Sequence, residues 1–413
     1  MRVALISAEY PPTPGGIGDY TSCLGQAWRS AGIEATIWTI RSGWLVACDP
    51  HEAASERRIA PAAWDWRCWQ ALDQAIASEQ PDIIHIQYQT GAYAMHPAIN
   101  LYPLRIRRRA KRPRVSATFH DLLMPYLFPK AGPVRRWVTK RLLTDVDRAI
   151  VTNSDDWAAV IGRAPADPSG LRFRGIAGQI PAPAVIPIGA NIEASPPPNY
   201  QREQWRQAQG YASDDLVLAF FGLISASKGL DTLLDALSFI PGDLRVRVVI
   251  IGGAAPAAQD RTYAAQIRER VAHLPAGIVQ ITGHSPPAEV SAHLLAADLA
   301  VLPFRDGASY RRGSLLAALA HGIATITTSP PATITIPTAF DSFDRPDLPT
   351  LQHDQHAHLV PPDQPQALAD AIVALAHDPA ARMRLGIAAT ELAKQFSWDT
   401  IAARHIHLYR KSL

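Results

Sequence analysis

Two adjacent arginines mark the segment Leu302–Gly322, whose sequence is LPFRDGASYRRGSLLAALAHG. It begins as the end of an apolar run and continues as an alanine- and leucine-rich helix. Arg311 and Arg312 stand at the junction, followed by Gly313 and Ser314. Because the first turn of a helix offers unpaired N–H groups and the positive end of the helix dipole, this junction is suited to binding an anion.

A second candidate anion site lies in FGLISASKGLDTLLDAL, where Lys228 opens a helix directly after an apolar strand. The helix dipole disfavours a lysine at this end, so a bound anion explains the residue better than stability does. Ser225 and Ser227 could cap the same helix. We expect Lys228 to bind phosphate.

The glycine-rich stretch Gly15–Tyr20, GGIGDY, is expected to form a turn after the first apolar strand. Such a turn lets the backbone approach an oxyanion, although tight geometry alone explains it equally well. It lacks the third glycine of the dinucleotide fingerprint, and the chain has no Walker A sequence, which argues against nicotinamide and P-loop chemistry.

Polar residues also end other apolar strands. His120 follows SATF, and His85 and Gln87 share one face of IIHIQY. A lone histidine at a strand end more often has a structural role, and the alternative for His85 and Gln87 is a polar strand end satisfied by backbone groups. The sequence has neither a serine nucleophile elbow nor a cysteine–histidine signature, so it does not support triad hydrolysis.

Metal binding and disulfides are not predicted. The cluster His353–His358, HDQHAH, matches no standard ligand spacing and is expected to be a loop. Cys23, Cys48 and Cys68 form no disulfide framework. With neither a signal peptide nor a run long enough to span a bilayer, the sequence indicates a cytoplasmic protein.

The net charge is only +3, but Arg105–Arg114, RIRRRAKRPR, carries seven positive charges. The run is either a solvated helix face or a surface attracted to anionic lipid or an anionic acceptor. The second interpretation would place the protein peripherally at the inner membrane face. Nucleic acid is not expected, because no recognition helix or aromatic stacking pattern accompanies the charges.

Apolar runs alternate with helical segments twice along the 413 residues, which predicts an α/β protein with two Rossmann-like, doubly wound parallel domains facing across a cleft. The proline-rich, polar segment Glu193–Asp215 suits a domain junction. Expected strands are Arg2–Ala8, Glu34–Ile40, Asp82–Tyr88, Arg114–Asp121, Arg148–Ser154 and Ala184–Ile192, then Leu216–Gly222, Arg245–Gly253, Ile278–His284, Leu299–Phe304 and Ile323–Ser329.

Several motifs occur in a characteristic order: YPPTPGGIGDYTSCLGQAWRSAG, DIIHIQYQ, FHD, VIPIGANI, FGLISASKGLDTLLDAL, ITGHSPPAEVSAHLLAADLAVLPF, LAALAHG and FSWDTIAARHIHLY. Together they resemble the GT-B glycosyltransferases, in particular glycosyltransferase family 4, a retaining group. The resemblance covers nearly the whole chain. It implies an acceptor-side domain over residues 1–195, a donor domain over residues 196–396, and a final helix at residues 397–413 that crosses back to the first domain.

The resemblance also implies roles for residues on the donor side. Lys228 matches the lysine that neutralises the donor diphosphate, in place of a metal ion or other cofactor. Gly15 and Gly16 look like the loop that approaches this diphosphate, and Gly283 and His284 match the loop beside the nucleotide base.

On the acceptor side, His120 looks like the histidine that contacts the transferred sugar. Asp19 would contact the acceptor, and with His120 and Lys228 it completes the candidate catalytic set. Tyr20, His85 and Gln87 are assigned to the acceptor side.

The chain departs from the family at its glutamates. The family has a Glu-x7-Glu pair in this helix region, and alignment on His321-Gly322 puts Ser309 and Ala317 at those positions. Neither residue can do a carboxylate's work. Leu223 also replaces an arginine that often follows the first glycine of this donor-side motif.

We expect other residues to supply the positive charge of the arginine that Leu223 replaces. Arg311 and Arg312, with the N–H groups of Gly313 and Ser314, would bind the diphosphate, and Asp306 would bind a sugar or ribose hydroxyl. The alternative is that the arginines are solvated or pair with Asp306 at the helix start.

The sequence therefore predicts an enzyme that transfers a sugar from a nucleotide-sugar donor to a hydroxyl of a glycan, a lipid-linked molecule or a small molecule. The resemblance implies the retaining, metal-independent reaction of the family. Because both glutamates are missing, a member that binds a nucleotide sugar or glycan without transfer is the main alternative. Another GT-B activity, such as a sugar-nucleotide epimerase or a phosphorylase, fits the motifs less well.

Overall fold

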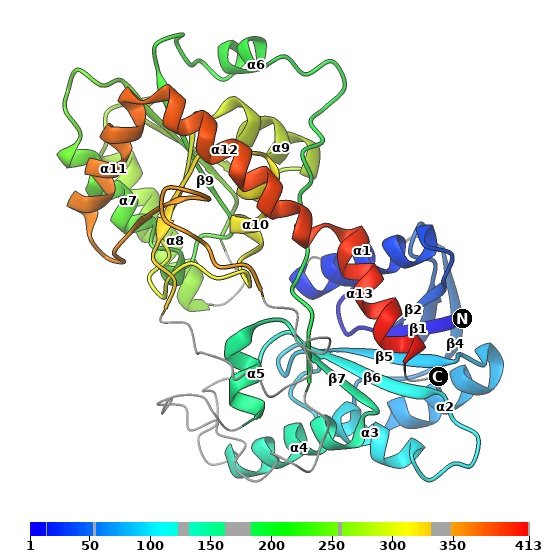
Figure 1. The fold of residues 1–413 in the computed structure, drawn as a ribbon. Helices are drawn as coiled ribbons and strands as arrows, with labels where there is room; N and C mark the ends of the chain where they lie inside the picture. The colour runs from blue at the N-terminus through cyan, green and yellow to red at the C-terminus, as the bar shows by residue number, and fades with distance from the viewer. Residues whose placement is uncertain are drawn as a thin grey trace. The chain divides into compact units, whose positions relative to one another are not determined.

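The computed structural model describes residues 1–13, 15–52, 55–122, 132–161, 183–254, 258–331 and 348–411. Within these residues the chain forms two compact units, drawn in Figure 1. The first comprises Met1–Ile188 and Trp398–Leu413, and the second comprises Gly189–Thr333 and Pro349–Ser397. Residues 193–215, expected at a junction, lie inside the second unit and include helix α6, Arg202–Ala208.

The first unit is built on a sheet with the strand order β4-β3-β2-β1-β5-β6-β7-β8. Strands β1, β2, β5, β6, β7 and β8 pair in parallel, whereas β3 and β4 are antiparallel additions at one edge. The expectation of a wholly parallel sheet is therefore wrong at this edge. The strands are β1 Arg2–Ile6, β2 Glu34–Arg41, β3 Trp44–Cys48, β4 Glu56–Pro61, β5 Ile83–Tyr88, β6 Arg114–Phe119, β7 Arg148–Val151 and β8 Ala184–Val185.

The expected turn at Gly15–Tyr20 is helical from its second residue, because α1 begins at Gly16. Gly18 serves close packing instead of a turn, since a Cβ there would lie 3.2 Å from the backbone of Glu9 and Tyr10. The helices of this unit are α1 Gly16–Ser30, α2 Arg67–Glu79, α3 Ala98–Ile106, α4 Gly132–Asp145, α5 Ser154–Val160 and α13 Trp398–Arg410.

The second unit has the strand order β11-β10-β9-β12-β13-β14, with all strands parallel. This is the order of a Rossmann sheet, in which ligands bind beyond the carboxyl ends of the strands where the winding reverses. The reversal falls between β9 and β12. The strands are β9 Leu216–Phe221, β10 Val246–Ile251, β11 Val279–Gly283, β12 Leu299–Leu302, β13 Thr325–Thr328 and β14 His358–Val360.

Lys228 ends the short 3₁₀ helix Ala226–Lys228, and it does not occupy the first turn of an α-helix as expected. Gly229 separates it from α7 in a left-handed conformation, with φ of 65°. A Cβ at Gly229 would collide with the carbonyl oxygen of Pro303, so only glycine fits. The α-helices here are α6, α7 Leu230–Ala236, α8 Ala258–Ala272, α9 Pro287–Ala296, α10 Gly313–Ala320, α11 Pro365–His377 and α12 Pro379–Ala393.

Helix α13 packs against α1 within the first unit (Figure 1). Trp28 of α1 is fully buried there, with its ring centroid 5.6 Å from that of His405 and 5.4 Å from that of Tyr409. His405 donates Nδ1–H to the carbonyl of Ile401 in its own helix. Burial lowers the pKa of His405 to about 4, so the ring is neutral at neutral pH.

This burial makes the first unit acid-sensitive. The unfolded chain protonates His405 near pH 6.5 but the folded chain does so only near pH 4, so stability is lost as pH falls through that window. We expect His405→Leu to flatten the fall in Tm between pH 7 and pH 5 in scanning calorimetry. His407→Leu, at an exposed position of the same helix, is the control. An equal fall in Tm in wild type and His405→Leu would contradict this assignment.

Candidate functional site

The candidate donor site lies where β9 and β12 end beside each other. Lys228 follows β9, and its ammonium lies 3.0 Å from the hydroxyl of Ser314, at the start of α10. Phe304 follows β12 and is fully buried. The Lys228 Nζ lies 5.0 Å from the Phe304 ring centroid and the Arg312 guanidinium carbon lies 5.1 Å from it, so one ring contacts both cations.

Few negatively charged groups lie close to these two cations in the described structure. Arg312 forms an ion pair with Asp306 and a 3.5 Å hydrogen bond with the Ser227 hydroxyl. Among the described residues, no carboxylate lies within ion-pair distance of Lys228. Burial lowers the pKa of Lys228 to about 7; Arg312 lowers it too, while Asp306 acts in the opposite direction.

The start of α10 keeps its backbone donors available, because no side chain caps this helix. Gly313 lies close to Asn191, whose Oδ1 would be 3.2 Å from a Cβ at that position. Of the paired arginines, only Arg312 joins Lys228. The described contacts of Arg311 are confined to its backbone N–H, which lies 3.3 Å from Ser309 Oγ.

The two positions of the missing glutamates differ in their surroundings. Ala317 is 0 % exposed inside α10, so it presents no group to a ligand. Ser309 is half-buried in the loop before the helix. Gly283 and His284 lie apart from the Lys228 group, at the end of β11 and two strands away from β9. Gly283 has a φ of 74°, and His284 is exposed.

Three of the expected acceptor-side residues meet in the first unit. His120 follows β6, and its Nε2 lies 2.7 Å from the side-chain carbonyl oxygen of Gln87 in β5. The ring of Tyr20, from α1, packs edge-on against His120 with 4.7 Å between centroids. Burial lowers the pKa of His120 to about 3, and His405 lowers it too.

The remaining acceptor-side residues are His85 and Asp19. His85 is 0 % exposed and its ring hydrogen-bonds with Thr118, at 2.8 Å, and with Tyr409. Its placement is that of a core histidine, which favours a structural role, and the acceptor-side assignment stays a prediction. Asp19 is exposed on the first turn of α1.

The sequence motifs do not single out Glu9, which lies three residues after the end of β1. Its carboxylate accepts the backbone N–H of Ile17 and lies against Gly15, where a Cβ would collide with it. Burial raises the pKa of Glu9; the Ile17 bond lowers it and Asp19 raises it. The first turn of α1, where Gly15 and Gly16 were expected to meet a diphosphate, thus already holds a carboxylate. An acidic residue in the short loop after the first strand is the signal that could have identified it.

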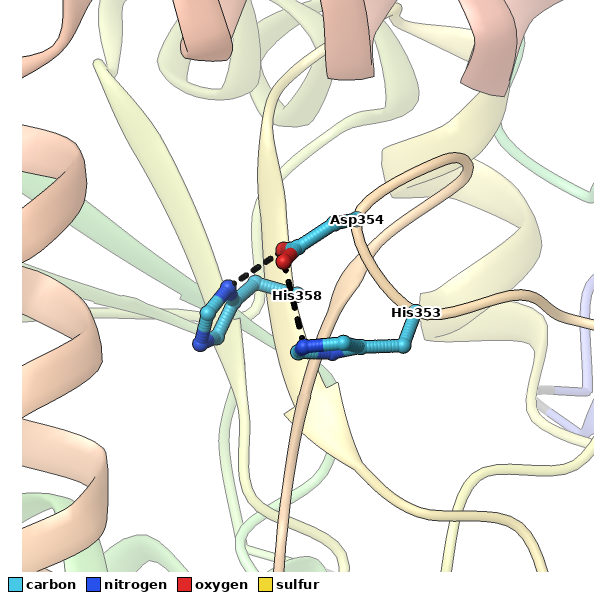
Figure 2. A group of neighbouring side chains, drawn as sticks. All are labelled: His353, Asp354 and His358. Carbon is cyan, nitrogen blue, oxygen red and sulfur yellow. Dashed lines mark hydrogen bonds and ion pairs between the residues drawn. The ribbon is translucent and has the colours of Figure 1, made fainter.

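A third cluster unites His353, Asp354 and His358, whose potential ligand atoms lie within 4.8 Å of one another (Figure 2). The loop expected here ends in β14, which begins at His358. Asp354 lies 3.1 Å from His353 Nε2 and 2.7 Å from His358 Nδ1. The N–H of Leu359 donates to His353 Nδ1, so in the neutral ring Nε2 carries the proton. Nε2 could bind a metal only by losing this proton and its contact with Asp354. The contacts describe a hydrogen-bonded turn.

The basic run Arg105–Arg114 is largely paired. Asp73 pairs with Arg105 and Arg109, Asp145 pairs with Arg107, and Asp147 pairs with Arg112 and Arg114. These contacts favour the structural interpretation, and membrane attraction stays a prediction. None of the described helices is long and apolar enough to cross a bilayer.

Comparison with known proteins agrees with this geometry. Residues 15–173 match the family model "Glycosyl transferase 4-like domain", and residues 215–378 match "Glycosyl transferases group 1". The D-inositol 3-phosphate glycosyltransferase of Jonesia denitrificans is 25% identical over 100% of this chain and 96% of that protein.

Solved structures show the same fold. Sucrose-phosphate synthase from Thermosynechococcus elongatus superposes with a TM-score of 0.70 at 21% identity, over 100% of this chain and 98% of that one. The Anabaena protein HepE in complex with UDP gives 0.66 at 15% identity, over 100% of both chains. The chain belongs to the group 1 glycosyltransferases and has the GT-B fold.

Proposed function

We propose that this glycosyltransferase moves a hexosyl group from a nucleoside-diphosphate sugar to a hydroxyl acceptor with retention of configuration, and that Lys228 and Arg312 bind the diphosphate. The observation that carries this proposal is that Lys228 and Arg312 both contact the Phe304 ring. Among the described residues, Asp306 is the carboxylate that forms an ion pair with one of these two cations, Arg312. The uncapped N–H groups of α10 adjoin the pair.

The chemistry needs such a site because charge develops on the leaving group. When the bond between the anomeric carbon and the phosphate oxygen breaks, negative charge grows on the diphosphate. Fixed cations and N–H donors that already face this group lower the barrier without reorganising. Lys228 and Arg312 would thus supply the positive charge that a metal ion supplies elsewhere.

Retention follows if the acceptor attacks from the face that the diphosphate leaves. The acceptor oxygen forms a bond to the anomeric carbon, and the acceptor proton passes to a phosphate oxygen of the leaving group. This route needs no enzyme nucleophile, which fits the replacement of the two family glutamates by Ser309 and Ala317. Asp306, paired with Arg312, is left to bind a sugar or ribose hydroxyl.

On the acceptor side, His120 is proposed to accept or donate a hydrogen bond to the transferred sugar as a neutral imidazole, in line with its lowered pKa. Asp19, exposed on α1, would contact the acceptor. The name of the Jonesia denitrificans relative makes inositol phosphate the first acceptor to test.

A binding protein without transfer is the second candidate, favoured by Ala317 and Ser309 at the glutamate positions. A panel of UDP-, GDP- and ADP-sugars with inositol phosphate and simple sugars separates the two. We expect transfer with at least one pair, and proton NMR of the first product should show the anomeric configuration of the donor. Binding without turnover, or inverted product, would contradict the proposal.

Donor binding should take up a proton at pH 8. Free Lys228 is then mostly neutral, and a bound diphosphate favours the ammonium, so uptake approaches one proton. Calorimetry with UDP, GDP or ADP in buffers of different ionisation enthalpy measures it. Lys228→Arg, which stays charged, should bind without uptake. Equal uptake by the two proteins would contradict the assignment.

The two adjacent arginines should differ in effect. Removing a charge-assisted contact costs about 1.5–3 kcal/mol, so we expect Arg312→Ala to weaken nucleoside diphosphate binding roughly tenfold or more. Arg311→Ala should stay within about twofold, because its described contacts involve only the backbone. Calorimetric Kd values compare them. Equal losses in both variants would rule out the distinct role of Arg312.

A further inference from the structure

Gln87 occupies a place that the proposed chemistry leaves unexplained. It is 0 % exposed near the end of β5, yet its side chain ends in a polar amide. The carbonyl oxygen of this amide lies 2.7 Å from His120 Nε2. Its Nε2 has no hydrogen-bond partner among the described residues. The amide therefore has one described bond, and that bond is to His120.

His120 is fixed from other directions as well. Its backbone N–H donates to the carbonyl of Tyr88, at 3.0 Å, because β5 and β6 pair in parallel up to Tyr88 and Phe119. The edge-on ring of Tyr20 packs against the imidazole. A ring held in this way keeps its orientation, so the position of its proton decides which nitrogen can act on a ligand.

A carbonyl oxygen can only accept, so the bond to Gln87 requires the proton on His120 Nε2. In the neutral ring Nδ1 then carries the lone pair, and no described residue bonds to it. Burial keeps the ring neutral, and the titratable groups with a described interaction with it are Tyr20 from α1, His405 from α13 and His85 from β5.

We propose that Gln87 is a positioning residue that holds His120 in the tautomer protonated at Nε2, with Nδ1 free to accept a hydrogen bond from a hydroxyl of the transferred sugar. This rests on the proposed role of His120 in sugar transfer. Gln87 itself touches His120 and no reacting atom. The opposite orientation of the amide would place its NH₂ group against Nε2 and force the opposite tautomer.

The tautomer can be measured independently of activity. Long-range ¹⁵N–¹H correlation spectra of the full-length protein report which ring nitrogen carries the proton, and His120→Asn identifies the His120 signals. We expect the Nε2–H form in wild type and in Gln87→Glu, which keeps an acceptor oxygen. Gln87→Met, of similar size, should lose the single tautomer. An Nδ1–H form in wild type, or an unchanged spectrum in Gln87→Met, would overturn the proposal.

Kinetics test the positioning role. We expect Gln87→Met to lower kcat roughly tenfold to hundredfold with little change in the donor KM, while Gln87→Glu recovers most of the rate. The carboxylate should also raise the pKa of His120 and add an acidic limb to the pH profile. Gln89→Leu, two residues along the chain, is the matched control and should behave as wild type.

The outcomes separate this proposal from the proposed function. If no variant and no wild-type sample transfers sugar, the function fails while the spectra still decide whether Gln87 sets the tautomer. If wild type is active, an unchanged kcat in Gln87→Met or in His120→Asn overturns the positioning role. Gln87→Met removes a buried NH₂ group that has no described partner, which favours a folded variant. Its fold is checked by Tm, and Gln87→Glu gives a second reading if it unfolds.

Discussion

The parallel pairing of β9 with both β10 and β12 is the constraint on which the donor site depends. Parallel strands end at the same edge of a sheet, and where the winding reverses the connecting loops diverge and leave the strand ends open. Lys228 and Phe304 come from the loops after β9 and β12. Their distance in sequence is large, but the sheet brings them together. A Cβ at Gly229 would strike Pro303, so this approach also needs glycine.

The two sites treat charge in opposite ways. In the second unit a half-buried ammonium lies beside a guanidinium with little negative charge nearby, and the cost appears as the lowered pKa of Lys228. A bound anion would relieve that cost, which is why the arrangement indicates binding more than stability. In the first unit burial keeps His120 neutral, and its hydrogen bond with Gln87 decides the proton position. The arrangement around Lys228 thus favours an anionic ligand, and the arrangement around His120 favours a neutral hydrogen-bonding ligand.

Much of the architecture could be predicted because apolar runs with short helical intervals leave few alternatives to a doubly wound sheet. The edge hairpin of β3 and β4 was not predicted, because Glu56–Pro61 (ERRIAP) lacks an apolar run and the apolar run Trp44–Cys48 does not by itself specify an antiparallel partner. The sequence predicts a turn where α1 begins, because the glycines of GGIGDY indicate a turn when their packing against Glu9 and Tyr10 is unknown. The bond of His85 to Tyr409 could not be predicted for a related reason: period two places His85 on a face with Gln87 but does not show which distant residue contacts it.

The sequence by itself determined the family and the two α/β halves, and it singled out Lys228 as a candidate, because these depend on local order: a strand, a turn and the residue that follows. Tertiary structure alone decided that Arg312 and not Arg311 joins Lys228, that Glu9 fills the start of α1, and that Asp73, Asp145 and Asp147 neutralise most of the basic run. Such choices depend on which side chain a folded backbone directs at a distant partner. Electrostatic energy falls with distance in space, and the spacing of residues along a chain does not fix that distance.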